Sequence, residues 1–153
     1  MIAGQATATV AASPDEVLDF FCDPERYRHA DTKIRRVLAV TPDGDDLIVR
    51  FRSRLRGLPA PAVSQRVHRT PGRVDVSDVA CWQNRFVTFT AFASCQPTAE
   101  GTQVTHREEF HFHGPLRPLL ERYLGTWIAS DVQDEVGRLR DILSPGAAAS
   151  PRP

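Results

Sequence analysis

The feature that most constrains the fold is one long amphipathic helix predicted near the end of the chain, from Pro115 to Leu143. Its apolar residues recur at three- and four-residue spacing and are Leu116, Leu120, Leu124, Trp127, Ile128, Val132, Val136, Leu139 and Leu143. At about 1.5 Å per residue, such a helix is a rod of roughly 40 Å. It can cross a whole small sheet, and a sheet is needed to cover its apolar side.

Alternating apolar and polar residues predict the strands of that sheet. The first strand shows this alternation in Ala6, Ala8 and Val10. Six more are predicted at Lys33 to Thr41, Asp46 to Leu55, Ala62 to Thr70, Arg73 to Cys81, Arg85 to Gln96 and Thr102 to His113. Turn signals such as Pro71-Gly72 separate them. Short connections join antiparallel neighbours, so we expect a seven-stranded antiparallel sheet.

Two short helices are predicted between the first two strands. Ser13 is placed to cap the first, with Pro14 at its first position and Glu16 completing a capping box. Asp23-Pro24 ends this helix and starts a second short one through Tyr27. The predicted fold class is α+β, with a curved sheet wrapped around the long helix and enclosing an internal cavity.

Composition limits the partners. The 153 residues suit a single domain, residues 1–143, followed by a Pro/Ala tail, residues 144–153, that we expect to be disordered. Basic and acidic residues number 19 each without a basic block, which argues against nucleic acid as a partner. No apolar run is long enough for membrane insertion, so we expect a cytoplasmic protein, either monomer or homodimer.

No metal or other cofactor is expected. Cys22, Cys81 and Cys95 lack the spacing of a zinc site or a disulfide framework and are interpreted as buried thiols. His111 and His113 share one strand face, but no third ligand supports them, and His106 lies on the opposite face.

The order of elements resembles the START-like (SRPBCC) superfamily, the helix-grip fold of birch-pollen-allergen-like proteins, the polyketide cyclase/dehydrase family and ubiquinone-binding proteins. The segments VAASPDEVLDFFCDPERY and HGPLRPLLERYL carry the likeness, which covers about residues 4 to 143. It implies a ligand held in an internal cavity. Val63 to Val67 is similar to the strand that places a serine and an arginine inside the cavity of aromatase/cyclases of the tetracenomycin type, which implies such roles for Ser64 and Arg66. In an alignment with those enzymes, a tyrosine that they use on the second strand corresponds to a position near Ile34 of this sequence.

These patterns give a candidate catalytic set. His106 and Glu108 share strand parity with Val104, Phe110 and Phe112 and are expected to face inward. The resemblance implies that Ser64, Arg66 and His68 face the cavity as well. An arginine can anchor a carbonyl or enolate oxygen, a histidine can transfer protons, and a carboxylate can assist it. Alternatively, Arg66 and Glu108 form a buried ion pair and the histidines are core residues.

Large side chains are expected to line or close the cavity. They are Phe20, Tyr27, Ile34, Trp82, Phe86, Phe92, Phe110, Phe112, Tyr123 and Trp127. Asp131 and Glu135 adjoin the apolar stripe of the last helix. Either one of them reaches the pocket, or both lie at the edge of the solvated face of the helix.

Arg50, Arg52, Arg54 and Arg56 form a basic row on one strand face. This row either docks the acidic helix of an acyl carrier protein or is a solvated face paired with acids of the neighbouring strands.

The leading hypothesis is a protein of bacterial secondary metabolism that binds a hydrophobic, polyketide-type molecule, in the manner of an aromatase/cyclase. As an enzyme it would catalyse aldol-type cyclisation with dehydration and need no cofactor. The alternative is a binder without turnover that sequesters or transports a natural product, including antibiotic self-resistance. A lipid or quinone chaperone is a third hypothesis, which the neutral charge weakens.

Overall fold

The computed structural model describes residues 1–144, so most of the predicted tail lies outside the described residues. In chain order the elements are β1 (Ile2–Val10), α1 (Pro14–Cys22), α2 (Pro24–Tyr27), β2 (Ile34–Asp43), β3 (Asp46–Leu55), β4 (Leu58–Thr70), β5 (Arg73–Asp78), η1 (Trp82–Arg85), β6 (Val87–Thr98), β7 (Gly101–Phe112) and α3 (Arg117–Leu143). The predicted α+β helix-grip architecture is confirmed.

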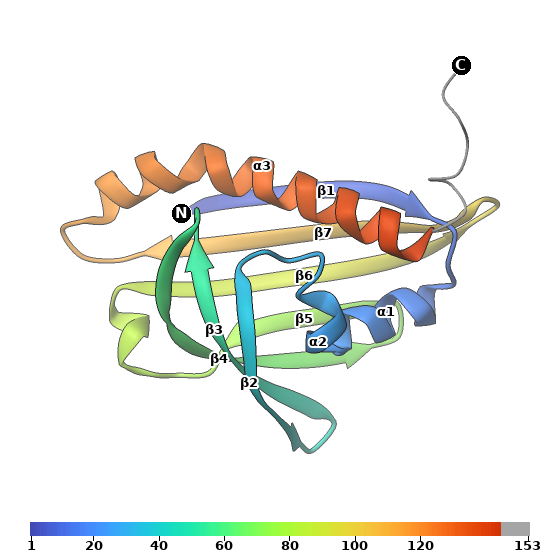
Figure 1. Ribbon diagram of the computed structural model, residues 1–153, viewed down its shortest axis with the longest axis horizontal. Coiled ribbons are helices and arrows are strands. Elements are labelled where there is room, and N and C mark those ends of the chain that lie inside the picture. Colours follow the sequence, from blue (N-terminus) through green and yellow to red (C-terminus); the bar gives the residue numbers. More distant parts are fainter. Residues whose placement is uncertain (145–153) are drawn as a thin grey trace.

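The seven strands form one antiparallel sheet in the order β1-β7-β6-β5-β4-β3-β2 (Figure 1). All neighbours in this order are also neighbours in sequence except β1, which pairs with β7 from Ile2 opposite Phe110 to Val10 opposite Thr102. The helix α3 lies along β1 and β7, while α1 packs on β4, β5 and β6. The helices therefore cover one face of the sheet from both ends of the chain.

A glycine sets how closely α3 approaches the sheet. A Cβ atom at Gly4 of β1 would lie 2.7 Å from the Ile128 carbonyl oxygen and 2.8 Å from Cγ2 of Val132. Both distances are shorter than real Cβ contacts. Only a residue without a side chain lets the helix lie this close to β1.

The start of α1 is fixed by the predicted capping box. The Ser13 hydroxyl accepts the backbone N–H of Glu16 at 3.2 Å, and the Glu16 carboxylate accepts the backbone N–H of Ser13 at 2.7 Å. The helix then buries Val17, Leu18 and Phe20 against the sheet. The rings of Phe20 and Phe21 also contact the ring of Tyr27 in α2, so the two short helices act as one cover.

Several boundaries differ from the sequence prediction; β4, for example, begins at Leu58 and not at Ala62. The strand predicted from Arg85 starts at Val87, because Trp82–Arg85 form the 3-10 helix η1, and β5 ends at Asp78. Ser144, predicted to begin the tail, is buried, and its hydroxyl accepts the backbone N–H of Ala11 at 2.8 Å. Within residues 1–144, no helix combines the length and the apolar character that a membrane span requires.

Candidate functional site

The main cavity has a volume of about 290 Å³ and opens between β3, β4, η1, β6 and β7. Much of its wall is apolar, including Phe51, Leu55, Val63, Val87, Phe89 and Phe110. A second cavity of about 40 Å³ adjoins it, since Asp31, Phe51, Gln65 and Phe89 line both. The smaller cavity reaches Tyr27, His106 and Glu108.

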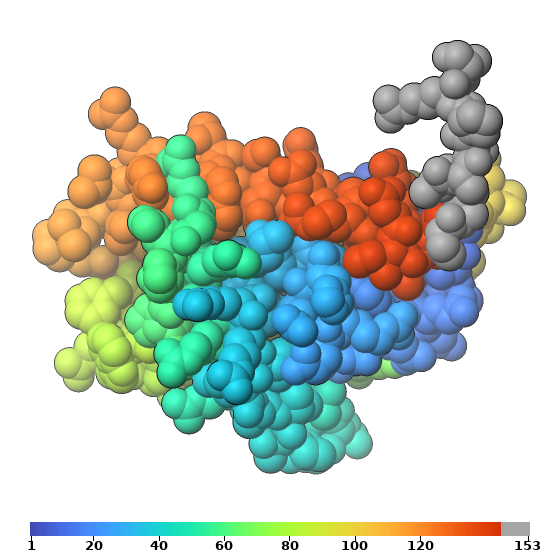
Figure 2. All heavy atoms as spheres, viewed as in Figure 1, coloured from blue at the N-terminus to red at the C-terminus, as the bar shows by residue number. Residues whose placement is uncertain are grey.

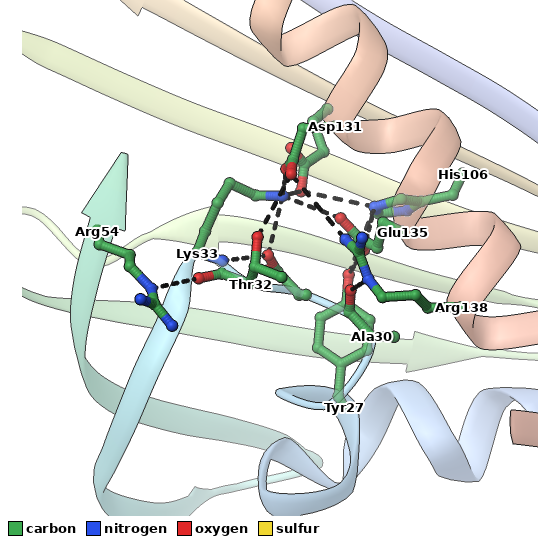
Figure 3. A network of polar contacts seen from close by, with 11 residues as sticks. Tyr27, Ala30, Thr32, Lys33, Arg54, His106, Asp131, Glu135 and Arg138 are labelled. Carbon is green, nitrogen blue, oxygen red and sulfur yellow. Dashed lines mark hydrogen bonds and ion pairs between the residues drawn. The ribbon is translucent and has the colours of Figure 1, made fainter. Parts of the chain in front are cut away.

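An ion cluster centred on Lys33 borders both cavities. The Lys33 Nζ atom lies 2.9 Å from Asp31, 2.8 Å from Asp131, 2.9 Å from Glu135 and 3.2 Å from Glu108, and none of these side chains is more than 8% exposed. Figure 3 shows Lys33 reaching from the α2–β2 connection to α3. We call these five residues the Lys33 cluster; it joins the N-terminal cover, β7 and α3.

His106 and Tyr27 extend the cluster through Glu135 (Figure 3). The Tyr27 hydroxyl donates to Glu135 Oε1, and His106 Nε2 lies 3.1 Å from the same oxygen atom. The Nδ1 atom of His106 lies 2.9 Å from the Phe92 carbonyl oxygen, which can only accept, so Nδ1 carries a proton. With Nε2 facing carboxylates, both ring nitrogens are donors and the ring is positively charged.

Burial and charge set the protonation states. Burial alone would lower the pKa of His106, but Glu135 and Glu108 outweigh it and raise this pKa to about 10. In the same way, the surrounding carboxylates raise the pKa of Lys33 well above its ordinary value. Burial would raise the pKa of Glu135, but Lys33 and His106 hold it below its ordinary value. Burial raises the pKa of Asp31 to about 7, and Lys33 offsets this only in part.

Two cations thus face four carboxylates inside the protein. The Glu108 Oε2 atom is buried and has no hydrogen-bond partner within residues 1–144. Ligand atoms of His106, Glu108 and Glu135 lie within 4.8 Å of one another, as do those of Asp31, Asp131 and Glu135, so either group has the spacing to hold a metal ion. In this structure the Lys33 ammonium supplies the cation next to all four carboxylates.

The predicted catalytic residues divide between the two faces of the sheet. His106 and Glu108 face inward as predicted and are 3% and 1% exposed. The predicted inward orientation of Arg66 and His68 is wrong. Arg66 lies on the outer face, 2.7 Å from Asp43 and 2.9 Å from Asp46, and His68 lies 2.6 Å from Asp46.

The apolar positions of β4 explain this correction. Val67 is 8% exposed and packs in the core, and Val63 lines the main cavity, so their parity faces inward. The intervening charged residues stay in water beside acids, which avoids burying a guanidinium. Ser64 does line the main cavity, together with Gln65.

The predicted lining residues are only partly brought together. Trp82, Phe86 and Phe110 line the main cavity, and Tyr27, Ile34 and Phe92 line the smaller one. The Phe92 ring itself lies under Arg73, 4.1 Å from its guanidinium carbon. Phe20 and Phe112 belong to the packed core, Tyr123 is exposed, and Trp127 lines a surface hollow. Cys81 is exposed and lines the main cavity, which corrects its interpretation as a buried thiol.

Sequence reasoning missed Asp31 and Lys33, which lie outside the predicted helices or at a strand boundary. A signal was present: Lys33 is the single lysine among 19 basic residues, the other 18 being arginine. Both Asp131 and Glu135 reach the cluster, whereas the sequence had left open whether even one of them does.

A curved antiparallel sheet that lines a mostly apolar cavity and carries one long helix packed on it defines a START-like protein. Residues 1–143 match the family model described as "Polyketide cyclase / dehydrase and lipid transport". The chain belongs to this family. Comparison with curated protein sequences finds no match.

Solved structures with the same fold include proteins of different descriptions. The protein TTHA0849 from Thermus thermophilus has a TM-score of 0.76 at 16% identity, covering 97% of this chain and 99% of that one. The di-domain aromatase/cyclase StfQ of the steffimycin biosynthetic pathway has a TM-score of 0.74 at 11% identity, covering 97% of this chain and 52% of StfQ. A START superfamily protein from Mycobacterium smegmatis has a TM-score of 0.69 at 14% identity, covering 92% and 96%. At these identities the likeness concerns the fold.

Proposed function

We propose that this protein binds a hydrophobic, polyketide-type molecule in its main cavity and catalyses an aldol-type cyclisation with loss of water. The observation that carries the proposal is the pair Asp31 and Lys33, 2.9 Å apart, in the wall of an otherwise largely apolar cavity. A carboxyl group with a pKa of about 7 can accept and return protons at neutral pH. Membership of the polyketide cyclase/dehydrase family and the fold shared with StfQ support the reaction class.

The cyclisation needs only these two side chains at the reacting atoms. The Asp31 carboxylate accepts a proton from a carbon between two carbonyl groups, and the electron pair left behind forms an enolate. The Lys33 ammonium stabilises the enolate oxygen. The enolate carbon bonds to a second carbonyl carbon of the same molecule, whose π electron pair moves to its oxygen. This oxygen then takes the proton back from Asp31.

Loss of water repeats the proton transfer. Asp31 accepts the remaining proton of the same carbon and delivers it to the departing hydroxyl group. A carbon–carbon double bond and one water molecule form, and the carboxylate is regenerated. Glu135, Asp131 and Glu108 position the Lys33 ammonium, and His106 and Tyr27 position Glu135.

Turnover is tested with a linear triketone in which one carbon lies between two carbonyl groups and which closes to a conjugated cyclohexenone, whose ultraviolet absorbance reports the product. Asp31→Asn should lower the rate by at least about a hundredfold, as expected for loss of a general base. Arg66→Ala is the matched control, because Arg66 lies on the outer face beside Asp43. An unchanged rate in Asp31→Asn would overturn the catalytic assignment.

One observation favours the second candidate, a binder without turnover. Most polar groups of the Lys33 cluster are already satisfied by one another, so the cluster also serves as a structural lining. Because the chain has one lysine, isotope-labelled lysine gives a single side-chain resonance that reports cavity occupancy. A flat naphthalene dye should shift this resonance and protect the Cys81 thiol from alkylation. Binding with recovery of the intact triketone would establish the binder, as expected for transport or self-resistance.

A further inference from the structure

The arginine row of β3 and the loop that follows it has no acidic partner within residues 1–144. Arg50, Arg52, Arg54 and Arg56 are all exposed, and none forms an ion pair within residues 1–144. Across the sheet, Arg52 stands opposite Arg36 of β2 and Ala62 of β4. Like charges placed opposite one another destabilise a sheet. The row is solvated, as one of the two interpretations of the sequence expected, but the pairing with acids of neighbouring strands is not found within residues 1–144.

Part of this basic face is concave. One hollow of about 270 Å³ is lined by Thr32, Arg54, Arg56, Gly57 and Trp127. A second hollow of similar volume is lined by Arg35, Arg54, Gly57 and Pro59. The two share Arg54 and Gly57, and we call them together the arginine groove. Three guanidinium groups thus line one depression, and no acidic residue is among its lining residues.

Two of these arginines are fixed in position. Arg54 Nε donates to the Thr32 carbonyl oxygen at 3.1 Å (Figure 3). Arg56 Nη1 donates to the Tyr123 carbonyl oxygen at 2.8 Å, and its guanidinium carbon lies 4.4 Å from the centre of the Tyr123 ring. Each guanidinium has five N–H donors, so most of them remain for a ligand. Figure 2 shows the β3–β4 hairpin lying against the first turns of α3.

The backbone at Arg56 is strained. Arg56 and Gly57 form the two-residue loop between Leu55 and Leu58, with φ of 50° and 79°. Asn or Gly is preferred where such a loop requires positive φ, and another residue there costs of the order of 1 kcal/mol. Anion binding explains why Arg56, despite its strained backbone, is held against Tyr123 at the edge of this basic hollow.

We propose that the arginine groove binds a phosphate group, with Arg54 and Arg56 as its principal ligands and Arg35 as the third. Guanidinium groups bind phosphate oxygens in paired, charge-assisted hydrogen bonds. Ser53 and Leu55 of the same strand line the main cavity. The groove therefore lies on the outer side of the strand whose inner side faces the cavity, and a phosphate ester would be held beside it. This site uses no residue of the Lys33 cluster.

The test is a titration with pyrophosphate at constant ionic strength, followed by the indole N–H resonances of the two tryptophans. Trp127 lines the groove and Trp82 does not, so Trp127 should shift and saturate while Trp82 stays fixed. Trp82→Phe assigns the two signals. Arg54→Gln should weaken binding about tenfold or more, and Arg35→Gln, whose side chain makes no hydrogen bond within residues 1–144, gives a second variant. Arg50→Gln, on the same row but outside the groove, should change binding less than about twofold.

Three outcomes would overturn the proposal: a shift that does not saturate, equal shifts of both indoles, or equal weakening by Arg50→Gln and Arg54→Gln. Competition against pyrophosphate distinguishes the possible sources of the phosphate group. A free phosphate ester and a carrier protein with a phosphate-bearing arm should each displace pyrophosphate if they use the groove. A carrier protein without that arm that displaces pyrophosphate equally well would indicate an acidic protein surface and contradict phosphate recognition. No turnover is measured, so the result is independent of the proposed reaction.

Discussion

Replacement of Lys33 by methionine tests whether the Lys33 cluster holds the fold together. The variant keeps most of the side-chain volume and removes the ammonium that contacts four carboxylates. Removing one partner of a buried ion pair costs about 3–5 kcal/mol, because the other charge stays buried and uncompensated. For a chain of this size each kcal/mol lowers the melting temperature by about 2–4 °C. Lys33→Met should therefore melt roughly 6–20 °C below the wild type at neutral pH.

The loss of stability in Lys33→Met should become smaller as the pH falls. Without the ammonium the buried carboxyl groups have raised pKa values in the folded state, so their protonation restores stability at lower pH. Denaturant unfolding of Lys33→Met between neutral and mildly acidic pH measures this recovery. In the double variant with Glu135→Gln, the two changes should be non-additive by about 0.5–3 kcal/mol, since the residues are 2.9 Å apart.

Arg50→Met is the matched control, because Arg50 is exposed and should change stability by no more than about 0.5 kcal/mol. A Lys33→Met protein within about 1 kcal/mol of the wild type at neutral pH would refute the reasoning. It would mean that the carboxylates are neutral or solvated without the lysine.

Three further predictions concern other parts of the structure. The pKa of His106, about 10 in the folded protein against 6.5 as the ordinary value, means that its stabilising contribution is complete below about pH 6.5 and is lost as the pH rises through 10. Urea unfolding across this range should show stability falling by up to about 1.4 kcal/mol per pH unit, and His106→Gln should flatten the profile. Arg66→Ala should leave dye binding unchanged and stability within about 1 kcal/mol, and weakened binding would contradict its outward orientation. Gly4→Ala should destabilise by about 1–3 kcal/mol through the contact with Ile128, whereas Gly137→Ala, where a Cβ meets open space, should stabilise the helix by up to about 1 kcal/mol; thermal unfolding compares them.

The fold was predictable because its local signals agree with one another. The capping box at Ser13, the alternation along the strands and the helical spacing from Leu116 to Leu143 each act over a few residues. The parity of β7 likewise identified His106 and Glu108 as inward-facing residues.

The prediction for β4 failed because two signals conflicted. The likeness to aromatase/cyclases turned Arg66 and His68 inward, while the apolar residues Val63 and Val67 indicated that the opposite side of the strand faces the core. A strand has a side-chain period of two, so placing Val63 and Val67 inward places Arg66 and His68 on the outer face. The structure buries the valines and leaves Arg66 hydrated, because a buried guanidinium costs more free energy than an exposed one.

The Lys33 cluster was not predictable from local pattern. Asp31 and Lys33 lie in the connection between α2 and β2, which has no periodicity. The partners of Lys33 on α3 follow 98 and 102 residues later in the sequence. Only the three-dimensional structure brings these groups within ion-pair distance.

The pairing of β1 with β7 has a consequence for synthesis of the chain. Residues 2–10 leave the ribosome before their hydrogen-bonding partners, residues 102–110, have been made. At about 5–20 residues per second, the first strand waits for roughly 5–20 seconds before its partner exists. The helix that covers both strands is made later still. The nascent polypeptide therefore carries an unpaired strand edge until residues 102–110 have been made, and the sheet and its covering helix are completed only after that.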